Sequence, residues 1–166
     1  MKGAAWLLAL FALLEIGHPW TFEALRYDRD GLLHGQIWRA LTAHLVHLGP
    51  VHAAMNSLAV LLLVALCRPQ WSVWGWCWRS AALAVPISLG LLAAVPALAS
   101  YVGFSGVAHG LFVLALWPLA VRGDWIARGC LLYLLGKLGW EMMFGAAVID
   151  SCLLYTSPSP RDLSTS

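Results

Sequence analysis

The sequence predicts an all-α, polytopic membrane helical bundle, and its composition carries that prediction. Hydrophobic residues make up 61% of the 166 residues and charged residues only 11%, whereas soluble domains are usually about 45–50% apolar and about 25% charged. The mean hydropathy of +0.77 agrees. A soluble domain of this length has too little interior to bury so many apolar side chains. Soluble enzymes and disordered proteins are therefore poor fits, and a net charge of +2 indicates no nucleic-acid partner.

Apolar runs divide the chain into five expected spans, judged against the roughly 20 residues that a helix needs to cross the hydrocarbon core. The first run is short, but no signal-peptide cleavage site follows it, so we expect it to stay attached. Residues 18–50 hold four of the six histidines and are predicted to form a long loop with short interfacial helices. Residues 71–79 are expected to form an aromatic belt at the membrane surface. The five expected spans are 3–16, 51–67, 80–98, 103–121 and 125–148.

The distribution of positive charge predicts the orientation in the membrane. With the N-terminus in the cytoplasm, five Lys and Arg residues lie on the cytoplasmic side and three on the other, which agrees with the positive-inside rule. The loop at 18–50 would then be extracytoplasmic. The five are Lys2, Arg68, Arg79, Arg122 and Arg128, and the three are Arg26, Arg29 and Arg39.

The composition changes at the C-terminal end of the chain. Residues 151–166 are rich in Ser, Thr and Pro, and the stretch from Cys152 to Asp162 looks like a translated sequencing adapter. We therefore expect a membrane domain over 1–150 and a non-native or disordered tail over 151–166. A genuine disordered tail is the alternative.

His52 and Asn56 are the first candidate site residues. They are four residues apart at the start of an apolar run, so both lie on one helical face. A neutral imidazole and an amide can each donate a hydrogen bond, which suits the stabilisation of a developing oxyanion. The structural alternative is hydrogen bonding between membrane helices.

Ser105 is the second candidate, because glycines surround it at the mouth of an expected span. Glycine lets a backbone approach a substrate closely, so an exposed Ser here could act as a nucleophile. Close helix packing is the alternative reading. His109 lies one turn further on the same face. Both side chains lean toward the helix N-terminus and run parallel, so we expect His109 to line the site, with the role of base as the alternative.

Other polar residues suggest no cofactor. His44, His47 and His52 do not share a helical face, and Gly49-Pro50 interrupts the helix between them, so we predict loop packing and no metal. The four cysteines show no metal-binding spacing. Lys137 and Glu141 are an oppositely charged pair four residues apart within an apolar helix, and we expect them to pair with neighbouring elements.

Taken together, these motifs resemble the rhomboid family of intramembrane serine proteases. Their order and spacing along the chain match that family over about residues 1–150. Within it, the chain is most similar to the rhombosortases, which process C-terminal Gly-Gly anchors. The matching motifs are Trp38-Arg39, His47 with His52 and Asn56, Gly103-Phe-Ser105-Gly106, and Ser105-Gly-x-x-His109-Gly110.

The resemblance implies a set of roles. Ser105 would be the nucleophile, His52 and Asn56 would hold the oxyanion with the Ser105 backbone N–H, and Gly103, Gly106 and His109 would line the site. Trp38, Arg39 and His47 would be a structural motif.

Rhomboids take their base from a His on a sixth helix. No His follows His109 here, so we expect that helix to be missing and this chain to be inactive.

Location and partners also follow from the resemblance. We expect a multi-pass protein of the bacterial inner membrane whose substrates are proteins anchored by a C-terminal transmembrane helix, with the lipid bilayer as its surroundings and no cofactor. A pseudoprotease that binds membrane helices without cutting them is the alternative. A further alternative is a small membrane protein built on its histidines, either a transporter or a metal or haem protein.

Overall fold

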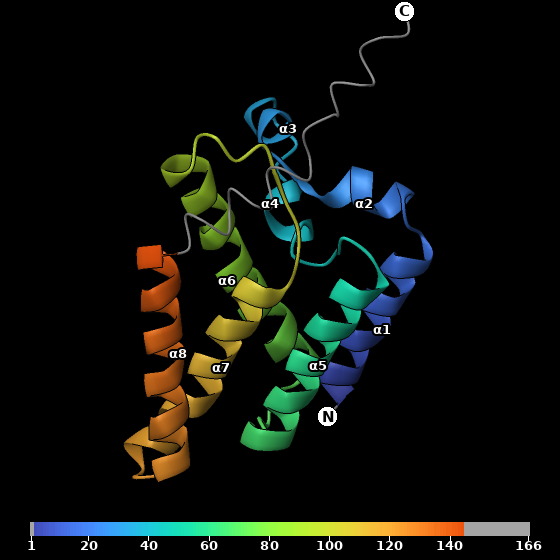
Figure 1. Cartoon of the computed structure of the whole chain (residues 1–166). Coiled ribbons are helices and arrows are strands. Elements are labelled where there is room, and N and C mark those ends of the chain that lie inside the picture. Colours follow the sequence, from blue (N-terminus) through green and yellow to red (C-terminus); the bar gives the residue numbers. More distant parts are fainter. Residues whose placement is uncertain (1, 145–166) are drawn as a thin grey trace, which may run out of the picture.

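The computed structural model describes residues 2–144, and their side chains as far as residue 140. Within that range the chain is almost entirely helical (Figure 1). Five helices have 15 residues or more and lie close to the five expected spans, which confirms the predicted helical bundle. They are α1 (Lys2–Ile16), α5 (Pro50–Cys67), α6 (Val73–Ala94), α7 (Ser105–Val121) and α8 (Trp125–Phe144).

Short elements occupy the loop between α1 and α5, as the sequence predicted. Three are helices and one is a two-residue strand that pairs antiparallel with a second strand just before α7. That small sheet was not expected from the sequence. The elements are α2 (Trp20–Leu25), β1 (Tyr27–Asp28), α3 (Arg29–Leu33), α4 (Arg39–Thr42) and β2 (Ser100–Tyr101).

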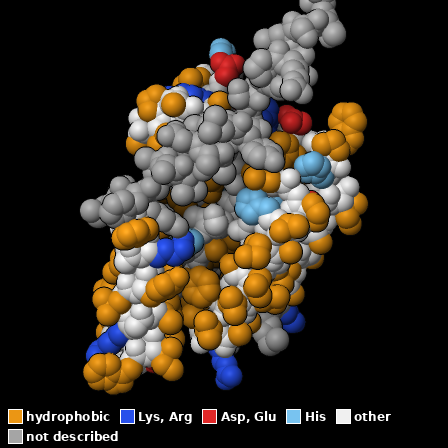
Figure 2. Space-filling model, in the orientation of Figure 1, with side chains coloured by type: hydrophobic (Ala, Val, Ile, Leu, Met, Phe, Trp, Pro, Cys, Tyr) orange, Lys and Arg blue, Asp and Glu red, His pale blue; other side chains and the backbone are white. Residues whose placement is uncertain are grey.

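The core lies where α1, α5, α6 and α7 meet. Phe11 of α1 is 1% exposed and stacks edge-on against Phe104, which is fully buried just before α7. Val60 and Leu111 complete the contact from α5 and α7. The helix α8 packs mainly on α7, so one side of the bundle is less enclosed than the other. Figure 2 shows hydrophobic side chains over most of the visible surface of the long helices.

Two described helices, α5 and α6, are both long and apolar enough to cross a membrane, and α7 is a shorter apolar helix. The boundaries of α6 correct the sequence prediction. We expected a span over 80–98 after an aromatic belt, but the helix begins at Val73 and ends at Ala94. Ser72 caps its start, because the Ser72 hydroxyl accepts a hydrogen bond from Gly75 N–H at 3.0 Å. The belt residues from Val73 to Arg79 are therefore the first two turns of the helix.

Two sequence predictions lie outside the described residues. The tail at 151–166 is one, and the side chain of Glu141, which we expected to pair with a neighbouring element, is the other.

Candidate active site

The loop between α1 and α5 fixes the segment that precedes α7. Tyr27 pairs with Tyr101 and Asp28 with Ser100 in the small sheet. Beyond it, Gly103 N–H donates to the Ala43 carbonyl at 3.1 Å. Hydrogen bonds between segments so far apart in sequence hold the start of α7 against the loop, and α7 begins at Ser105.

Trp38 and Arg39 hold the loop together from within. The Arg39 guanidinium donates to the carbonyls of Glu23 and Arg26 at 3.1 and 2.8 Å. The Trp38 indole N–H reaches the Ala24 carbonyl at 3.4 Å. Planar guanidinium donors suit a site where two carbonyls must be bonded at once. Trp38 and Arg39 therefore bond loop carbonyls, and neither residue lines the cavity described below.

Ser105 is the first residue of α7, and its side chain is exposed. The first hydrogen bond of the helix runs from Ala108 N–H to the Phe104 carbonyl, at 2.8 Å. The N–H groups of Ser105, Gly106 and Val107 therefore have no acceptor within the helix. Phe104 provides no side-chain cap. Unpaired N–H groups and the positive end of the helix dipole both favour a negative charge beside Ser105.

His52 of α5 lies directly against the loop that precedes Ser105. A Cβ built on Gly103 would lie 2.8 Å from His52 Cε1 and 2.9 Å from Nε2. Gly103 also has φ +119°, a conformation that L side chains rarely adopt. Leu48 N–H donates to His52 Nδ1 at 3.4 Å. With Nδ1 as an acceptor, the neutral ring carries its proton on Nε2, which becomes a donor facing the Gly103 side.

Asn56 lies one turn below His52 and is only 3% exposed. One amide hydrogen of its Nδ2 is donated to the His52 carbonyl at 3.0 Å. A primary amide has two such hydrogens, so a second remains for another acceptor.

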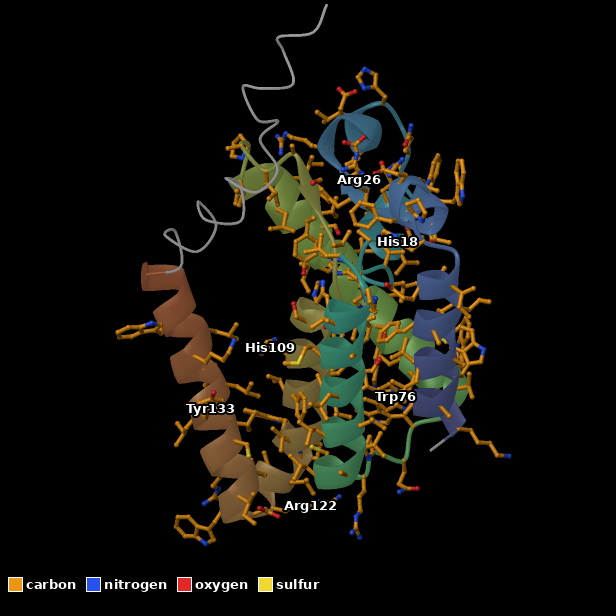
Figure 3. The ribbon with its side chains drawn as sticks, turned by 45° about the vertical axis from the view of Figure 1, so that its right-hand side comes forward. His18, Arg26, Trp76, His109, Arg122 and Tyr133 are labelled. Carbon is orange, nitrogen blue, oxygen red and sulfur yellow. The ribbon has the colours of Figure 1, made fainter. Side chains whose placement is uncertain are left out.

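One cavity brings these residues together. It measures about 240 Å³ and is lined by His52 and Asn56 from α5, Ser105 and His109 from α7, and Leu134 from α8, among others. Ser105, Ala108, His109 and Phe112 lie at helical spacing along its α7 wall. Figure 3 shows His109 projecting from α7 toward α8. Its Nδ1 is 2.7 Å from the Ser105 carbonyl, which binds the ring to its own helix.

The glycines beside Ser105 lie behind the cavity and do not line it, which differs from the predicted placement. Gly106 and Gly110 face α6, where an added Cβ would lie 3.3 Å from Ile87 Cδ1 and 2.6 Å from Leu83 Cδ2. Small residues here let α6 and α7 approach closely. Gly103 is not a lining residue, but its backbone lies against Cε1 and Nε2 of His52, which lines the cavity.

Tyr101 is a neighbour of Ser105 that the sequence analysis did not single out. Its hydroxyl donates to the Gly103 carbonyl at 3.3 Å. Burial raises the pKa of Tyr101, while its contacts with Ser105 and the Gly106 backbone oppose that shift. The phenol therefore stays protonated at neutral pH and holds the loop at Gly103. The only sequence signal was its position, four residues before Ser105.

His44 and His47 lie behind the site, both 1% exposed. His44 Nε2 is 3.0 Å from the Ser88 hydroxyl, and that hydroxyl donates to the Ala40 carbonyl. His47 packs edge-on against Phe11 and His52, with ring centroids 4.9 and 5.3 Å apart. Burial, and to a smaller extent the nearby His52, lowers the pKa of His47 to about 4. Over the described residues, no three His, Cys, Asp or Glu side chains are placed to share a metal ion.

Comparison with known families identifies the fold. The rhomboid domain model matches residues 34–159. The chain belongs to the rhomboid family. Comparisons with curated proteins and with solved structures find no match. The match covers the second half of the loop from residue 34, every residue of the cavity, and the first part of the tail from residue 151.

Membership agrees with the membrane protein that the composition predicted. Rhomboids are generally intramembrane serine proteases, so the hydrolase class also follows from the match. The family match assigns no residue roles by itself. Those rest on the geometry of Ser105, His52 and Asn56 described above.

Proposed function

We propose that this rhomboid is a serine endopeptidase whose nucleophile is Ser105. One observation carries the proposal: Ser105, His52 and Asn56 line the same cavity, at the amino ends of α5 and α7. Figure 1 shows those two ends on the same side of the bundle, opposite the amino end of α1. Polar groups at membrane depth are tolerated where they line a cavity, and they commonly mark a functional site.

The arrangement fits acyl transfer through a tetrahedral intermediate. The Ser105 hydroxyl oxygen would attack the scissile carbonyl carbon while a base takes its proton. The carbonyl oxygen then becomes an anion. His52 Nε2–H, the second amide hydrogen of Asn56 and the Ser105 backbone N–H are three donors beside that position, and such preorganised donors stabilise the charge that develops. The leaving amine would take the proton back from the base.

The base is the component that this polypeptide does not carry at the family's usual place. No His follows His109 among the 166 residues. His109 itself is bonded to the Ser105 carbonyl on its own helix, and its side chain runs parallel to that of Ser105. A base that approaches the hydroxyl from another helix is better placed to remove the proton. We therefore expect the 166-residue chain to cleave peptides only weakly.

The test compares two polypeptides in one proteoliposome assay. One is the 166-residue chain, and the other carries a sixth helix with an Ala-His sequence in place of residues 151–166. Ser105→Ala in each gives the blank. We expect Ser105-dependent cleavage in the completed protein alone. Equal cleavage by the 166-residue chain, abolished by His109→Ala, would show that His109 is the base and would refute this assignment.

A second candidate is a rhomboid pseudoprotease that binds membrane helices without cutting them, which the position of His109, hydrogen-bonded to the Ser105 carbonyl on its own helix, favours. The two candidates predict different sequences in the source gene beyond Asp150. An Ala-His on a further apolar segment of the source gene supports the protease, and a frame without it supports the pseudoprotease.

For substrates, we propose proteins held in the bacterial inner membrane by a C-terminal helix, with a Gly-Gly pair before it, as the similarity to rhombosortases implies. The N-terminus would be cytoplasmic and the cavity close to the extracytoplasmic face. Glycine suits a narrow site because it has no side chain to place there. The completed protein should cleave a reporter with the Gly-Gly pair and spare one with Val-Val at the same place. Equal cleavage of both would refute this preference.

A further inference from the structure

A second cavity lies far from Ser105, between α1, α4 and the first half of α6. It measures about 390 Å³, and its lining is almost entirely apolar. Trp6 and Leu10 form its α1 side, Leu41 and Leu45 its upper end, and Trp78 and Ala81 its α6 side. We call this cavity the α1–α6 groove. Trp6 and Trp78 are about half exposed, so the groove opens on the outer surface of the bundle, where a membrane protein meets lipid.

Two polar atoms at the groove have no hydrogen-bond partner among the described residues. They are the hydroxyl of Ser80, a residue 9% exposed, and the indole N–H of Trp76, 2% exposed. Both residues belong to the groove lining. Figure 3 shows Trp76 in the lower half of the bundle, close to α1, and a Cβ on Gly3 would collide with its ring. A buried donor without an acceptor is costly, so the Ser80 hydroxyl favours an occupant that brings an acceptor oxygen, whereas Trp76 Nε1 lies against Gly3 of α1.

Two cations, Arg79 and Lys2, lie beside lining residues of the groove, and neither has an ion pair among the described residues. The Arg79 guanidinium lies against the rings of Trp71 and Trp78, 4.7 Å from each centroid. One of its N–H groups donates to the Gly75 carbonyl at 3.0 Å, and a guanidinium has five such donors. Residues 31–123 contain no Asp or Glu. Lys2 is exposed and shares a helical face with Trp6 of the groove.

The positions of these groups along α6 match the order of phosphate, ester and acyl chain in a phospholipid. Gly75 lies one turn before Arg79, so its carbonyl draws the guanidinium about 5.4 Å toward the start of α6. The Ser80 hydroxyl remains about one turn deeper. A phosphate at Arg79 and Lys2 would therefore place an ester carbonyl near Ser80 and an acyl chain along the apolar wall. Basic pockets between membrane helices bind anionic headgroups in this way.

We propose that the α1–α6 groove binds one anionic phospholipid of the surrounding bilayer. Arg79 and Lys2 hold its phosphate, Ser80 donates to an ester oxygen, and an acyl chain fills the groove. The site is separate from Ser105, and the proposal does not depend on catalysis.

The test is native mass spectrometry of the 166-residue chain in detergent, titrated with dioleoylphosphatidylglycerol or dioleoylphosphatidylcholine. We expect one tightly bound phosphatidylglycerol and clearly weaker binding of phosphatidylcholine. Arg79→Gln and Lys2→Gln should each weaken phosphatidylglycerol binding about fivefold, the usual contribution of one cation near a lipid surface. Arg122→Gln is the matched control, because Arg122 is exposed at the α7–α8 turn, and it should change nothing.

Three results would overturn the proposal. They are equal affinity for the two lipids, the same loss in Arg122→Gln as in Arg79→Gln, and a protein dimer in place of the lipid adduct. If Arg79→Gln does not fold, Lys2→Gln gives the answer alone, because Lys2 is exposed on the first turn of α1. Ser80→Ala separates the ester contact from the charge. It should weaken the binding of both lipids by a similar factor, and unchanged binding would remove Ser80 and the ester contact from the site.

Discussion

Replacing Gly103 with Ala should damage both the backbone and the oxyanion site. The backbone at Gly103 has φ +119°, and a non-glycine residue in such a region costs about 1–3 kcal/mol. The new methyl would also lie 2.8 Å from His52 Cε1, closer than real Cβ atoms come to other atoms. His52 must then move, while the Gly103 N–H remains tied to the Ala43 carbonyl at 3.1 Å.

We expect the melting temperature of Gly103→Ala in detergent to fall by roughly 2–10 °C, since 1 kcal/mol is worth about 2–4 °C in a chain of this size. Gly129→Ala is the control, because Gly129 is helical and exposed, with nothing within 4 Å of an added Cβ. That variant should be neutral or stabilised by about 0.5–1 kcal/mol. If Gly103→Ala melts no lower than Gly129→Ala, the close contact between the loop and His52 is wrong.

Three further variants test the loop, the buried histidine and the oxyanion donors. Arg39→Ala should cost about 1–3 kcal/mol of stability, because it leaves two loop carbonyls without their donor. It should also speed protease cleavage within residues 18–36. An unchanged cleavage rate would contradict the contacts of Arg39. The lowered pKa of His47 means that the folded state keeps it neutral while the unfolded chain takes up a proton below its ordinary pKa of 6.5. Stability should therefore be full above about pH 6.5 and fall by roughly 3 kcal/mol as the pH drops to about 4. His47→Phe should make this profile shallower in chemical unfolding, with a remaining slope from His44, whose pKa burial also lowers, and the exposed control His34→Gln should keep the full profile. In a completed protein, His52→Ala or Asn56→Ala should lower kcat about 10²–10³-fold, with folding checked by circular dichroism; full activity of the double variant would remove both from the site.

Most of the fold could be predicted from hydropathy, because a lipid environment demands long apolar helices whatever their packing. The start of α6 could not be predicted from hydropathy. Its first two turns are rich in tryptophan, which suits both a membrane surface and a helix, and the deciding feature is the cap that the Ser72 hydroxyl offers to Gly75 N–H. The small sheet was missed because each strand has two residues, too few to show an alternating pattern.

The site could be predicted in part. His52 and Asn56 share a helical face and Ser105 lies between Gly103 and Gly106, so residue type and spacing indicated each of them. That they line one cavity depends on how α5 and α7 pack, which spacing along one chain cannot give. The positions of Tyr101 and of Gly106 depend on contacts with the loop and with α6, and the sequence carried no periodic signal for either.

The length of α7 has a consequence for any substrate. Its 17 residues give a helix about 26 Å long, shorter than the roughly 30 Å hydrocarbon thickness of a bilayer. The bilayer must thin around it, or Ser105 must lie below the headgroups. Recessed in this way, the hydroxyl cannot reach a peptide bond that is buried inside a regular helix. In the proposed protease, a substrate would first have to uncoil the end of its membrane anchor, so selection would act on how easily that end unwinds as well as on the residues beside the cut.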